Sequence, residues 1–233
     1  MSVASDPPAS GAAAGGAGAS GGAAASEEAL RLIDDAGRLG VPLDPGRAAA
    51  LLRLLDELST WNRAYSLSAI SAREAMIRGH LLDSLSALPD LAGARIADVG
   101  TGAGFPGLPL ALVAPERRFT LIDSVAKKIR FVAHAARQLG LGNVSALQTR
   151  VETLRPQPPF DTVIARAYAA LPGLLASVQG LAGPATRVVA LKGRYPREEL
   201  AALPPGWRLE QCRAVQVPGL AAERHVLRLV RAV

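Results

Sequence analysis

Two patterns of apolar residues follow one another along the chain, and the first is helical. Asp44 followed by Pro45 predicts the start of a helix, because aspartate caps a helix and proline suits its first position. Leucines then recur at helical spacing from Leu51 to Leu58. Together with a second helical stretch over roughly 72–88, this pattern predicts an N-terminal cap of helices.

From residue 95 onward, short apolar strands alternate with helical stretches. The candidate strands are 95–99, 118–122, 143–147, 160–164, 186–191, 207–217 and 224–231, and the helical stretches lie near 106–114, 125–139 and 170–182. Such alternation requires a parallel sheet with right-handed crossovers, whereas the closely connected last two strands can only be antiparallel. The pattern predicts an α/β fold with a Rossmann-like, mostly parallel seven-stranded sheet and an antiparallel C-terminal strand.

Residues 1–26 differ from the rest because they are almost entirely alanine, glycine and serine. Such a segment buries too little apolar surface to offset its chain entropy, so we expect a disordered tail. It lacks the basic start and apolar stretch of a secretory signal. Ser26 is then expected to cap the first helix. The predicted organisation is a tail at 1–26, a helical segment at 27–92 and a Rossmann-like domain at 93–233.

Size and composition narrow the class of protein. The 233 residues suffice for one α/β domain with an accessory segment, and the apolar share of 49% permits a sizeable core. No apolar run approaches the roughly 18 to 20 residues of a membrane span, so we expect a soluble protein. Cys212 is the only cysteine, which excludes an internal disulfide and a zinc site built on several thiolates. We expect a cytoplasmic protein without a metal.

The positive charge of the chain is unevenly distributed and is carried almost entirely by arginine. Residues 1–45 hold two arginines and six acidic residues, so they account for −4 of the net +6 and the remainder for +10. Arginine suits bidentate contacts with phosphate, which favours a polyanionic partner such as nucleic acid. A genome rich in G and C would also favour arginine codons, so charge alone leaves both explanations open.

The most informative segment is the loop DVGTGAGFPG, from Asp98 to Gly107, between a predicted strand and a predicted helix. It contains the pattern Gly-x-Gly-x-x-Gly, in which glycines let the backbone approach a ligand closely. Asp123 follows at the end of the next strand, where a carboxylate can bind both hydroxyls of a ribose. These features serve NAD and S-adenosylmethionine alike.

Two residues of the loop separate these cofactors. Pro106 lacks an N–H at the start of the helix, where the pyrophosphate of a dinucleotide needs amide donors. Asp98 would repel a pyrophosphate but suits the ammonium group in the methionine part of S-adenosylmethionine. The loop therefore favours S-adenosylmethionine, with NAD, or a glycine turn that binds no ligand, as the alternatives.

From about residue 45 to its C-terminus the sequence resembles the RsmG (GidB) family of bacterial small-subunit rRNA guanine-N7 methyltransferases. The resemblance is carried by WNRAYSL at 61–67, HLLDS at 80–84, DVGTGAGFPG at 98–107, LIDS at 121–124, KK at 127–128, RVE at 150–152, ARA at 165–167, LKG at 191–193 and ERH at 223–225. Each fragment is short, but their order and spacing are specific. The resemblance implies a class I S-adenosylmethionine-dependent methyltransferase fold and methyl transfer to N7 of a guanine in 16S rRNA.

The resemblance also implies roles for individual residues. Gly100 and Phe105 would line the cofactor pocket, and Asp123 would hold the ribose. Val151 and Glu152 would frame the adenine, and Arg166 would lie beside the cofactor. The predicted cofactor-binding residues are therefore Asp98, Gly100, Gly102, Gly104, Phe105, Asp123, Val151, Glu152 and Arg166.

Methylation of a ring nitrogen makes few demands on the sequence. Guanine N7 has a free lone pair at neutral pH, so positioning and electrostatics supply most of the acceleration and no catalytic triad is expected. Attack through C5 of a pyrimidine would need a cysteine nucleophile, but Cys212 is expected to be a small buried hydrophobe. Amino-group methylation commonly uses an Asn/Asp-Pro-Pro-aromatic turn after the fourth strand. This chain reads IARA at 164–167 and lacks that turn, so methylation of a ring nitrogen remains.

Several polar residues remain open to two interpretations. Arg166 and Lys192, at the ends of the fourth and fifth strands, are the catalytic candidates, against a surface salt bridge or a solvated strand end. The basic cluster of Lys127, Lys128 and Arg130 suits RNA or a solvated face equally.

His80 and Asp83 share a helix face and are expected to form a structural hydrogen-bonded pair or, alternatively, to hold the target base. Tyr65 and Phe105 are candidates for stacking on that base. Trp61 is expected to pack helix against sheet, and Asn62 to cap the end of its helix.

The sequence thus predicts a monomeric methyltransferase that uses S-adenosylmethionine and acts on 16S rRNA or the small ribosomal subunit. Two alternatives from other classes stay open, an NAD-dependent oxidoreductase and a non-catalytic RNA-binding module.

Overall fold

The computed structural model describes the backbone of residues 19–232 and the side chains of residues 27–232. Helix α1 runs over Ala19–Arg38, so it begins before the predicted cap at Ser26. Alanine is the best helix former, which allows the helix to extend into this alanine-rich stretch. The disorder predicted for residues 1–18 lies outside the described residues. No helix in the described part of the chain has the length and apolar character to cross a bilayer.

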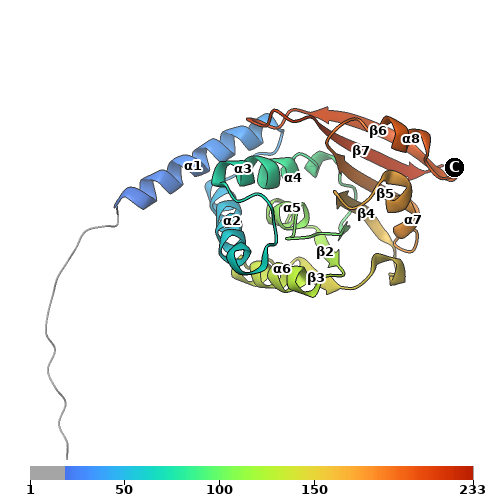
Figure 1. Ribbon diagram of the computed structural model, residues 1–233, viewed down its shortest axis with the longest axis horizontal. Coiled ribbons are helices and arrows are strands. Elements are labelled where there is room, and N and C mark those ends of the chain that lie inside the picture. The colour runs from blue at the N-terminus through green and yellow to red at the C-terminus, as the bar shows by residue number, and fades with distance from the viewer. Residues whose placement is uncertain (1–18, 233) are drawn as a thin grey trace, which may run out of the picture.

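One seven-stranded sheet organises the chain, as predicted (Figure 1). Its strands are β1 (Arg95–Val99), β2 (Arg118–Asp123), β3 (Val144–Gln148), β4 (Phe160–Arg166), β5 (Ala182–Lys192), β6 (Trp207–Val215) and β7 (Arg224–Arg231). They lie in the order β3-β2-β1-β4-β5-β7-β6. The first five strands pair in parallel, and β7 is antiparallel to both β5 and β6.

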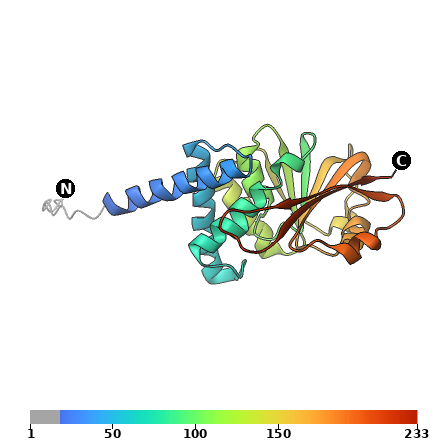
Figure 2. The ribbon, with the colours of Figure 1, turned by 90° about the horizontal axis from the view of Figure 1, so that it is seen from above.

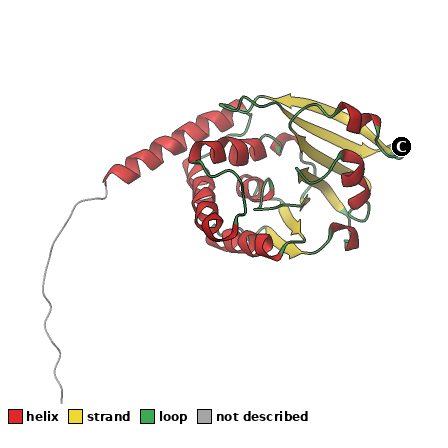
Figure 3. Cartoon of the chain, viewed as in Figure 1, coloured by secondary structure: helices red, strands yellow, loops and turns green. Residues whose placement is uncertain are grey.

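The helices connect and cover these strands (Figure 3). Besides α1 they are α2 (Pro45–Tyr65), α3 (Arg73–Met76), a π-helical segment (Ile77–Leu82), α4 (Asp83–Leu85), a 3-10 turn (Leu88–Asp90), α5 (Gly107–Val113), α6 (Ala126–Gln138), a 3-10 turn (Val151–Thr153), α7 (Leu171–Ser177) and α8 (Arg197–Ala201). Asp44 caps α2 as predicted, because its side chain accepts from the backbone N–H of Arg47.

Three elements differ from the prediction. The helical stretch near 72–88 is interrupted by the π-helical segment. Helix α7 ends at Ser177 rather than near 182, because residues 182–185 already belong to β5. Helix α8 was not predicted, since its five residues carry no apolar period.

Apolar side chains on the two faces of the sheet form two cores. Along β5, Val189 and Leu191 face the N-terminal helices, α5 and α6, whereas Val188 and Ala190 face α7. This alternation follows from the two-residue repeat of a strand. Figures 1 and 2 show helices α1–α4 at one end of the molecule and α7 and α8 at the other. Because the first five strands run parallel, their carboxyl ends lie on one edge of the sheet, and the N-terminal helices flank this edge.

Candidate functional site

The loop after β1 is organised around the buried carboxylate of Asp98. Its Oδ2 atom accepts from Oγ1 of Thr101 at 2.6 Å and from the backbone N–H of Gly107 at 2.8 Å. Its Oδ1 atom is buried and has no hydrogen-bond partner among the described residues. Burial raises the pKa of Asp98 to about 6. The carboxylate therefore keeps one acceptor free in a setting that disfavours its charge.

The glycines of the loop allow a backbone path that other residues resist. Gly100, Gly102 and Gly104 have φ angles of 64°, 60° and 85°. A Cβ atom on Gly104 would lie 2.3 Å from Leu108 at the start of α5. One on Gly100 would lie 2.3 Å from the ring of Tyr168. Backbone conformation thus requires glycine at all three positions, and close packing requires it at Gly100 and Gly104 as well.

Asp123 lies at the carboxyl end of the neighbouring strand β2 and is 6% exposed. Its Oδ2 atom accepts from the backbone N–H of Gly102 at 3.1 Å and from Nζ of Lys128 at 3.3 Å, and its Oδ1 atom accepts from the N–H of Val125 at 2.9 Å. An ionised carboxylate has about four acceptor positions, so one remains for a ligand hydroxyl. Lys128 of the basic cluster therefore pairs within the site rather than with solvent alone.

A cavity of 390 Å³ opens beside this carboxylate. Its walls include Gly100, Asp123, Val151 and Glu152, so four of the predicted cofactor-binding residues come together there. Tyr168 forms another wall, and its hydroxyl lies 3.5 Å from Oε1 of Glu152. Tyr168 was missed at the sequence level because it follows β4 in a loop without a motif of its own.

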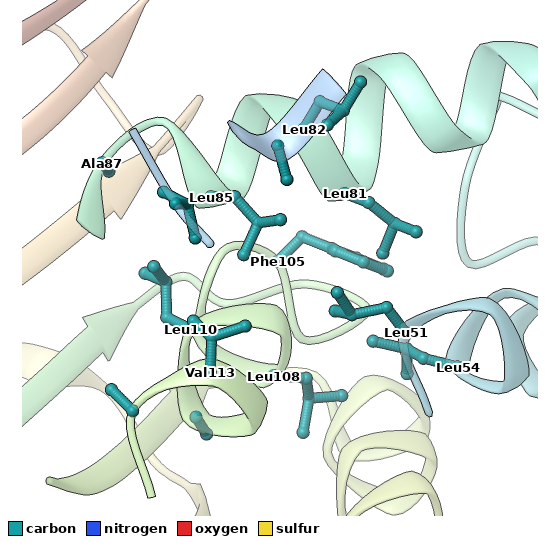
Figure 4. Packing of buried hydrophobic residues seen from close by; sticks show 14 of the residues in the cluster. Leu51, Leu54, Leu81, Leu82, Leu85, Ala87, Phe105, Leu108, Leu110 and Val113 are labelled. Carbon is teal, nitrogen blue, oxygen red and sulfur yellow. The ribbon is translucent and has the colours of Figure 1, made fainter. Parts of the chain in front are cut away.

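Phe105, a predicted pocket residue, instead contributes to the core between α5 and the N-terminal helices (Figure 4). Its ring is 4% exposed and stacks on His80, with centroids 4.6 Å apart. The Arg166 guanidinium lies 5.6 Å from the centre of the same ring. Phe105 thus packs against the side chains of His80 and Arg166 and is too buried to stack on an RNA base.

Arg166, at the end of β4, is held by the N-terminal helices. Its Nη1 atom donates to the carbonyl oxygen of Gly79 at 2.8 Å and to Oδ2 of Asp83 at 3.0 Å. The Oδ1 atom of Asp83 accepts from Nε of Arg224, on β7, at 2.8 Å. Because the Asp83 side chain is only 5% exposed, this is a largely buried bridge between two arginines and not a surface ion pair. Arg166 lies at the boundary between helical cap and sheet.

His80 contacts the same arginine but does not pair with Asp83. Burial, reinforced by the Arg166 cation, lowers the pKa of His80 to about 4, so the ring is neutral at pH 7. Nη2 of Arg166 lies 3.4 Å from Nδ1 of His80, and Ser68 Oγ lies 2.8 Å from Nε2. Since arginine can only donate, Nε2 carries the proton and donates to Ser68. The expected His80–Asp83 hydrogen bond is therefore wrong, although both residues bind Arg166.

A second cavity, of 440 Å³, lies against this network. Arg166, Lys192 and Arg224 line it, and Ala167 lines both this cavity and the first one. Ala167 has a φ angle of 51°, a left-handed conformation that is strained for alanine. The small side chain at the junction therefore separates two cavities along the carboxyl edge of the sheet.

Lys192, the other catalytic candidate, is engaged by groups of the protein. Its Nζ atom donates to Oε2 of Glu199 at 2.7 Å and to the carbonyl oxygen of Ala169 at 3.0 Å. The side chain lines the second cavity, and because a lysine ammonium group has three N–H donors, these two contacts leave one for a ligand. Lys127, from the basic cluster, donates to the carbonyl oxygen of Tyr65 at 2.9 Å.

Three further expectations concern packing. Asn62 terminates α2 as predicted, because its Oδ1 atom accepts from the backbone N–H groups of Leu67 and Ser68. Trp61 packs against Phe131 of α6, so it joins helix to helix and not helix to sheet. Cys212 is only partly buried, at the margin of the core around α7.

The carboxyl edge of the sheet offers three chemical capabilities, of which one, at Asp98, is fully buried and lines neither cavity. A free buried carboxylate oxygen suits a cationic group, and a carboxylate at the next strand suits vicinal hydroxyls. The second cavity, lined by guanidinium groups, suits a polar planar ligand or one that bears phosphate. No group of three or more His, Cys, Asp or Glu side chains among the described residues is placed to hold a metal ion.

The sequence matches proteins of one named family. A family model described as "rRNA small subunit methyltransferase G" (GidB) matches residues 47–227. A protein of Alkalilimnicola ehrlichii named "Ribosomal RNA small subunit methyltransferase G" is 50% identical over 190 residues, which cover 82% of this chain and 86% of that protein. A protein of the same name from Pseudomonas paraeruginosa is 45% identical over 197 residues, covering 84% of this chain and 92% of the relative.

The fold has solved counterparts as well. Magnesium protoporphyrin IX methyltransferase from Synechocystis, whose crystal structure contains bound SAM, superposes with a TM-score of 0.53 at 19% identity, covering 75% of this chain and 91% of the other. At that identity the likeness shows the fold alone. It confirms the predicted class I methyltransferase architecture, with its mostly parallel seven-stranded sheet and antiparallel C-terminal strand.

Proposed function

The chain belongs to the rRNA small subunit methyltransferase G family, and on this premise we propose that it methylates N7 of a guanine in 16S rRNA. It is an S-adenosylmethionine-dependent methyltransferase that acts on the RNA of the small ribosomal subunit. Beyond this activity, we propose that the acceptor base is a guanine and that N7 is the methylated atom. The single observation that carries it is the pairing of a cofactor-type cavity with a second cavity across Ala167.

The residues around the first cavity fit S-adenosylmethionine. Asp123 would accept from the ribose hydroxyls at the cavity wall. Asp98 is buried and does not line the cavity, so the ammonium group of the methionine part would have to reach inward to its free Oδ1 atom. Val151, Glu152 and Tyr168 would frame the adenine. Among the loop glycines, Gly102 leaves open space for the approach of the cofactor. Phe105 would act indirectly, through its contacts with His80 and Arg166.

The second cavity is the proposed place of the acceptor base. When bound, S-adenosylmethionine supplies an electrophilic methyl group on its sulfonium. Arg166 and Arg224, held by Asp83, would orient the base by donating to its oxygen acceptors, and the apolar wall of Leu191 would exclude water. Guanine N7 needs no deprotonation before attack, so no side chain has to remove a proton. Positioning and electrostatics then supply the acceleration.

The neutral imidazole of His80 has a part in this arrangement. It occupies the space beside Arg166 without adding a second positive charge, which would repel that guanidinium. It thereby helps to fix the arginine at the boundary of the two cavities. His80 is a positioning residue in this proposal and Arg166 the residue that touches the ligands, while Lys192 would act by holding the end of β5 against Glu199.

We further propose that the protein works as a cytoplasmic monomer, with residues 27–92 as a helical segment on the Rossmann-like domain of 93–233. The tertiary contacts between α2 and both α5 and α6 support a helical segment that packs on the domain. Cytoplasmic location follows from the ribosomal substrate.

The decisive experiment is methyl transfer to small ribosomal subunits isolated from cells that lack this protein. Labelled methyl groups should enter 16S rRNA, and mass mapping should place them on N7 of one guanine. A label on another atom would contradict the guanine-N7 assignment but not the methyltransferase. Isothermal titration with S-adenosylhomocysteine and NAD serves as the check on the cofactor, since the alternative oxidoreductase would bind NAD and a plain RNA-binding module would bind neither.

A further inference from the structure

We propose that the loop between β5 and α8, residues 193–196, binds a single-stranded rRNA segment next to the target nucleotide. Tyr195 would stack on a neighbouring base, and Arg194 would contact a phosphate. The inference rests on the proposed function and extends it to the RNA strand that flanks the methylated base.

Tyr195 is an exposed aromatic ring on an anchored loop. Tyr195 is one of the exposed large apolar residues, with 46% of its surface accessible. It packs edge-on against His225 of β7, with centroids 5.8 Å apart. Nδ1 of His225 in turn donates to the carbonyl oxygen of Gly193 at 2.8 Å. Pro196 is buried on the other side, so the loop presents the tyrosine ring from a fixed backbone.

Two arginines flank the ring. Arg194 and Arg197 are both exposed, and neither has a carboxylate within 4.0 Å among the residues that the structure describes. Their charge is thus available to a partner, unlike that of Lys192, which Glu199 neutralises. Arginine next to an exposed aromatic ring is the combination by which proteins hold single-stranded RNA, with phosphates bound by charge and bases by stacking.

The loop also adjoins the cavity proposed for the target base, where the flanking RNA would leave that cavity. Gly193 and Arg224 line the proposed base cavity. Arg224 also lines a larger groove of 920 Å³, together with Tyr195, His225 and the end of α1 at Arg38. The cofactor cavity, the base cavity and this groove therefore follow one another along the sheet edge, joined at Ala167 and at Arg224. A nucleotide inserted in the second cavity would bring its neighbour to the groove.

The occupant is an RNA strand and not a peptide or a membrane. The described charged residues that line the groove are Arg38, Arg224 and Glu223. Arg194 and Arg197, which neighbour Tyr195 in the chain, add positive charge next to it. An exposed aromatic ring with arginines before and after it in the chain suits stacking on a base whose phosphates are bound by charge. Continuity with the base cavity supplies the geometric reason, because the same polynucleotide occupies both.

The test compares four variants in steady-state methylation of small subunits. Tyr195→Ala should raise KM for the subunit at least fivefold with kcat unchanged, since a stacking contact is lost from binding alone. Tyr195→Phe keeps the ring and should stay within twofold of the unaltered protein. Arg194→Gln should raise KM about threefold or more and flatten its dependence on salt. Arg118→Gln is the matched control, because Arg118 is exposed at the opposite end of the parallel strands and has no carboxylate within 4.0 Å in the described part of the chain.

Affinity for S-adenosylhomocysteine and the melting temperature should be the same in all four variants. If the unaltered protein methylates subunits while Tyr195→Ala and Arg194→Gln keep its KM, the loop does not bind RNA and the inference fails alone. If Arg118→Gln raises KM as much as Arg194→Gln, the effect is one of net charge, which also overturns the inference. If the unaltered protein transfers no methyl group, the proposed function fails and the inference with it.

Discussion

At the scale of single residues, burial makes the charge of Asp98 depend on pH in the range near neutrality. Its pKa of about 6 means that the folded protein binds a proton here more tightly than the unfolded chain, whose carboxyl group titrates near 4. The group therefore contributes stability below about pH 4, and this contribution is lost as the pH rises through about 6. Above that pH the buried carboxylate is ionised at a cost in stability, which the ammonium group of the proposed cofactor would offset.

This predicts that cofactor affinity depends on pH. The dissociation constant for S-adenosylhomocysteine should increase as the pH falls through about 6, because protonation of Asp98 removes the partner of the ligand ammonium group. Titration calorimetry between pH 5 and pH 8 measures it. Asp98→Asn should weaken binding about tenfold or more at pH 7.5 and remove the pH dependence. Asp123→Asn should weaken binding but keep the dependence, and a flat profile for the unaltered protein would exclude Asp98 from the cofactor site.

A second residue-scale prediction concerns the glycine loop. Gly104→Ala should lower the free energy of unfolding by about 2 kcal/mol or more, since it adds left-handed strain and a contact with Leu108 at 2.3 Å. Urea unfolding measures the loss. Gly142→Ala is the control, because nothing lies within 4 Å of its Cβ position and its φ is not positive. Equal stability of the two variants would show that the loop backbone can relax.

At the scale of elements, periodicity predicted the strands well and the irregular helices poorly. β1 and β7 have the predicted bounds, because an apolar run between turn residues leaves little freedom. The π-helical segment Ile77–Leu82 has the same apolar positions as an ordinary helix, so only its tertiary contacts select the wider turn. This segment carries His80 and precedes Asp83, which is why the bridge between the two arginines could not be predicted. The positions of Asp98 and Asp123 at the carboxyl ends of β1 and β2 could be predicted, because they depend on local strand boundaries.

The buried bridge from Asp83 to Arg166 and Arg224 is expected to stabilise the packing of the helical cap on the sheet. Asp83→Asn should destabilise the protein by about 3 kcal/mol in urea unfolding, because Arg166 and Arg224 lose the only carboxylate that pairs with them among the described residues. Asp56→Asn is the matched control. Its carboxylate is 65% exposed and pairs with Arg73, so its loss should cost less than about 1 kcal/mol. Similar losses in both variants would mean that burial adds nothing to the Asp83 bridge.

At the scale of the whole molecule, the site is a junction of segments far apart in sequence. The cavity proposed for the cofactor is built by the loops after β1 to β4. The cavity proposed for the base is lined mainly by the π-helical segment, the carboxyl ends of β4 and β5 and the start of β7. Local motifs could therefore predict the first cavity, and only the folded chain brings Gly79, Arg166 and Arg224 to the second. The groove beyond it belongs to segments to which the sequence alone gave no role.

The uneven distribution of positive charge over the molecule predicts that binding of the small subunit depends on salt concentration. Residues 46–233 carry +10, and binding of their arginines to RNA phosphates releases counterions from the RNA. Raising the salt concentration from about 50 to about 200 mM should therefore raise KM for small subunits by roughly tenfold or more, as for about three phosphate contacts on single-stranded RNA. The dissociation constant for S-adenosylhomocysteine should change less than about twofold over the same range, because its carboxylate contacts are buried and weakly screened. Methylation assays and calorimetry on the same preparation separate the two effects. A KM that stays constant would mean that the arginines do not contact phosphate, and recognition would then depend on uncharged contacts with the subunit.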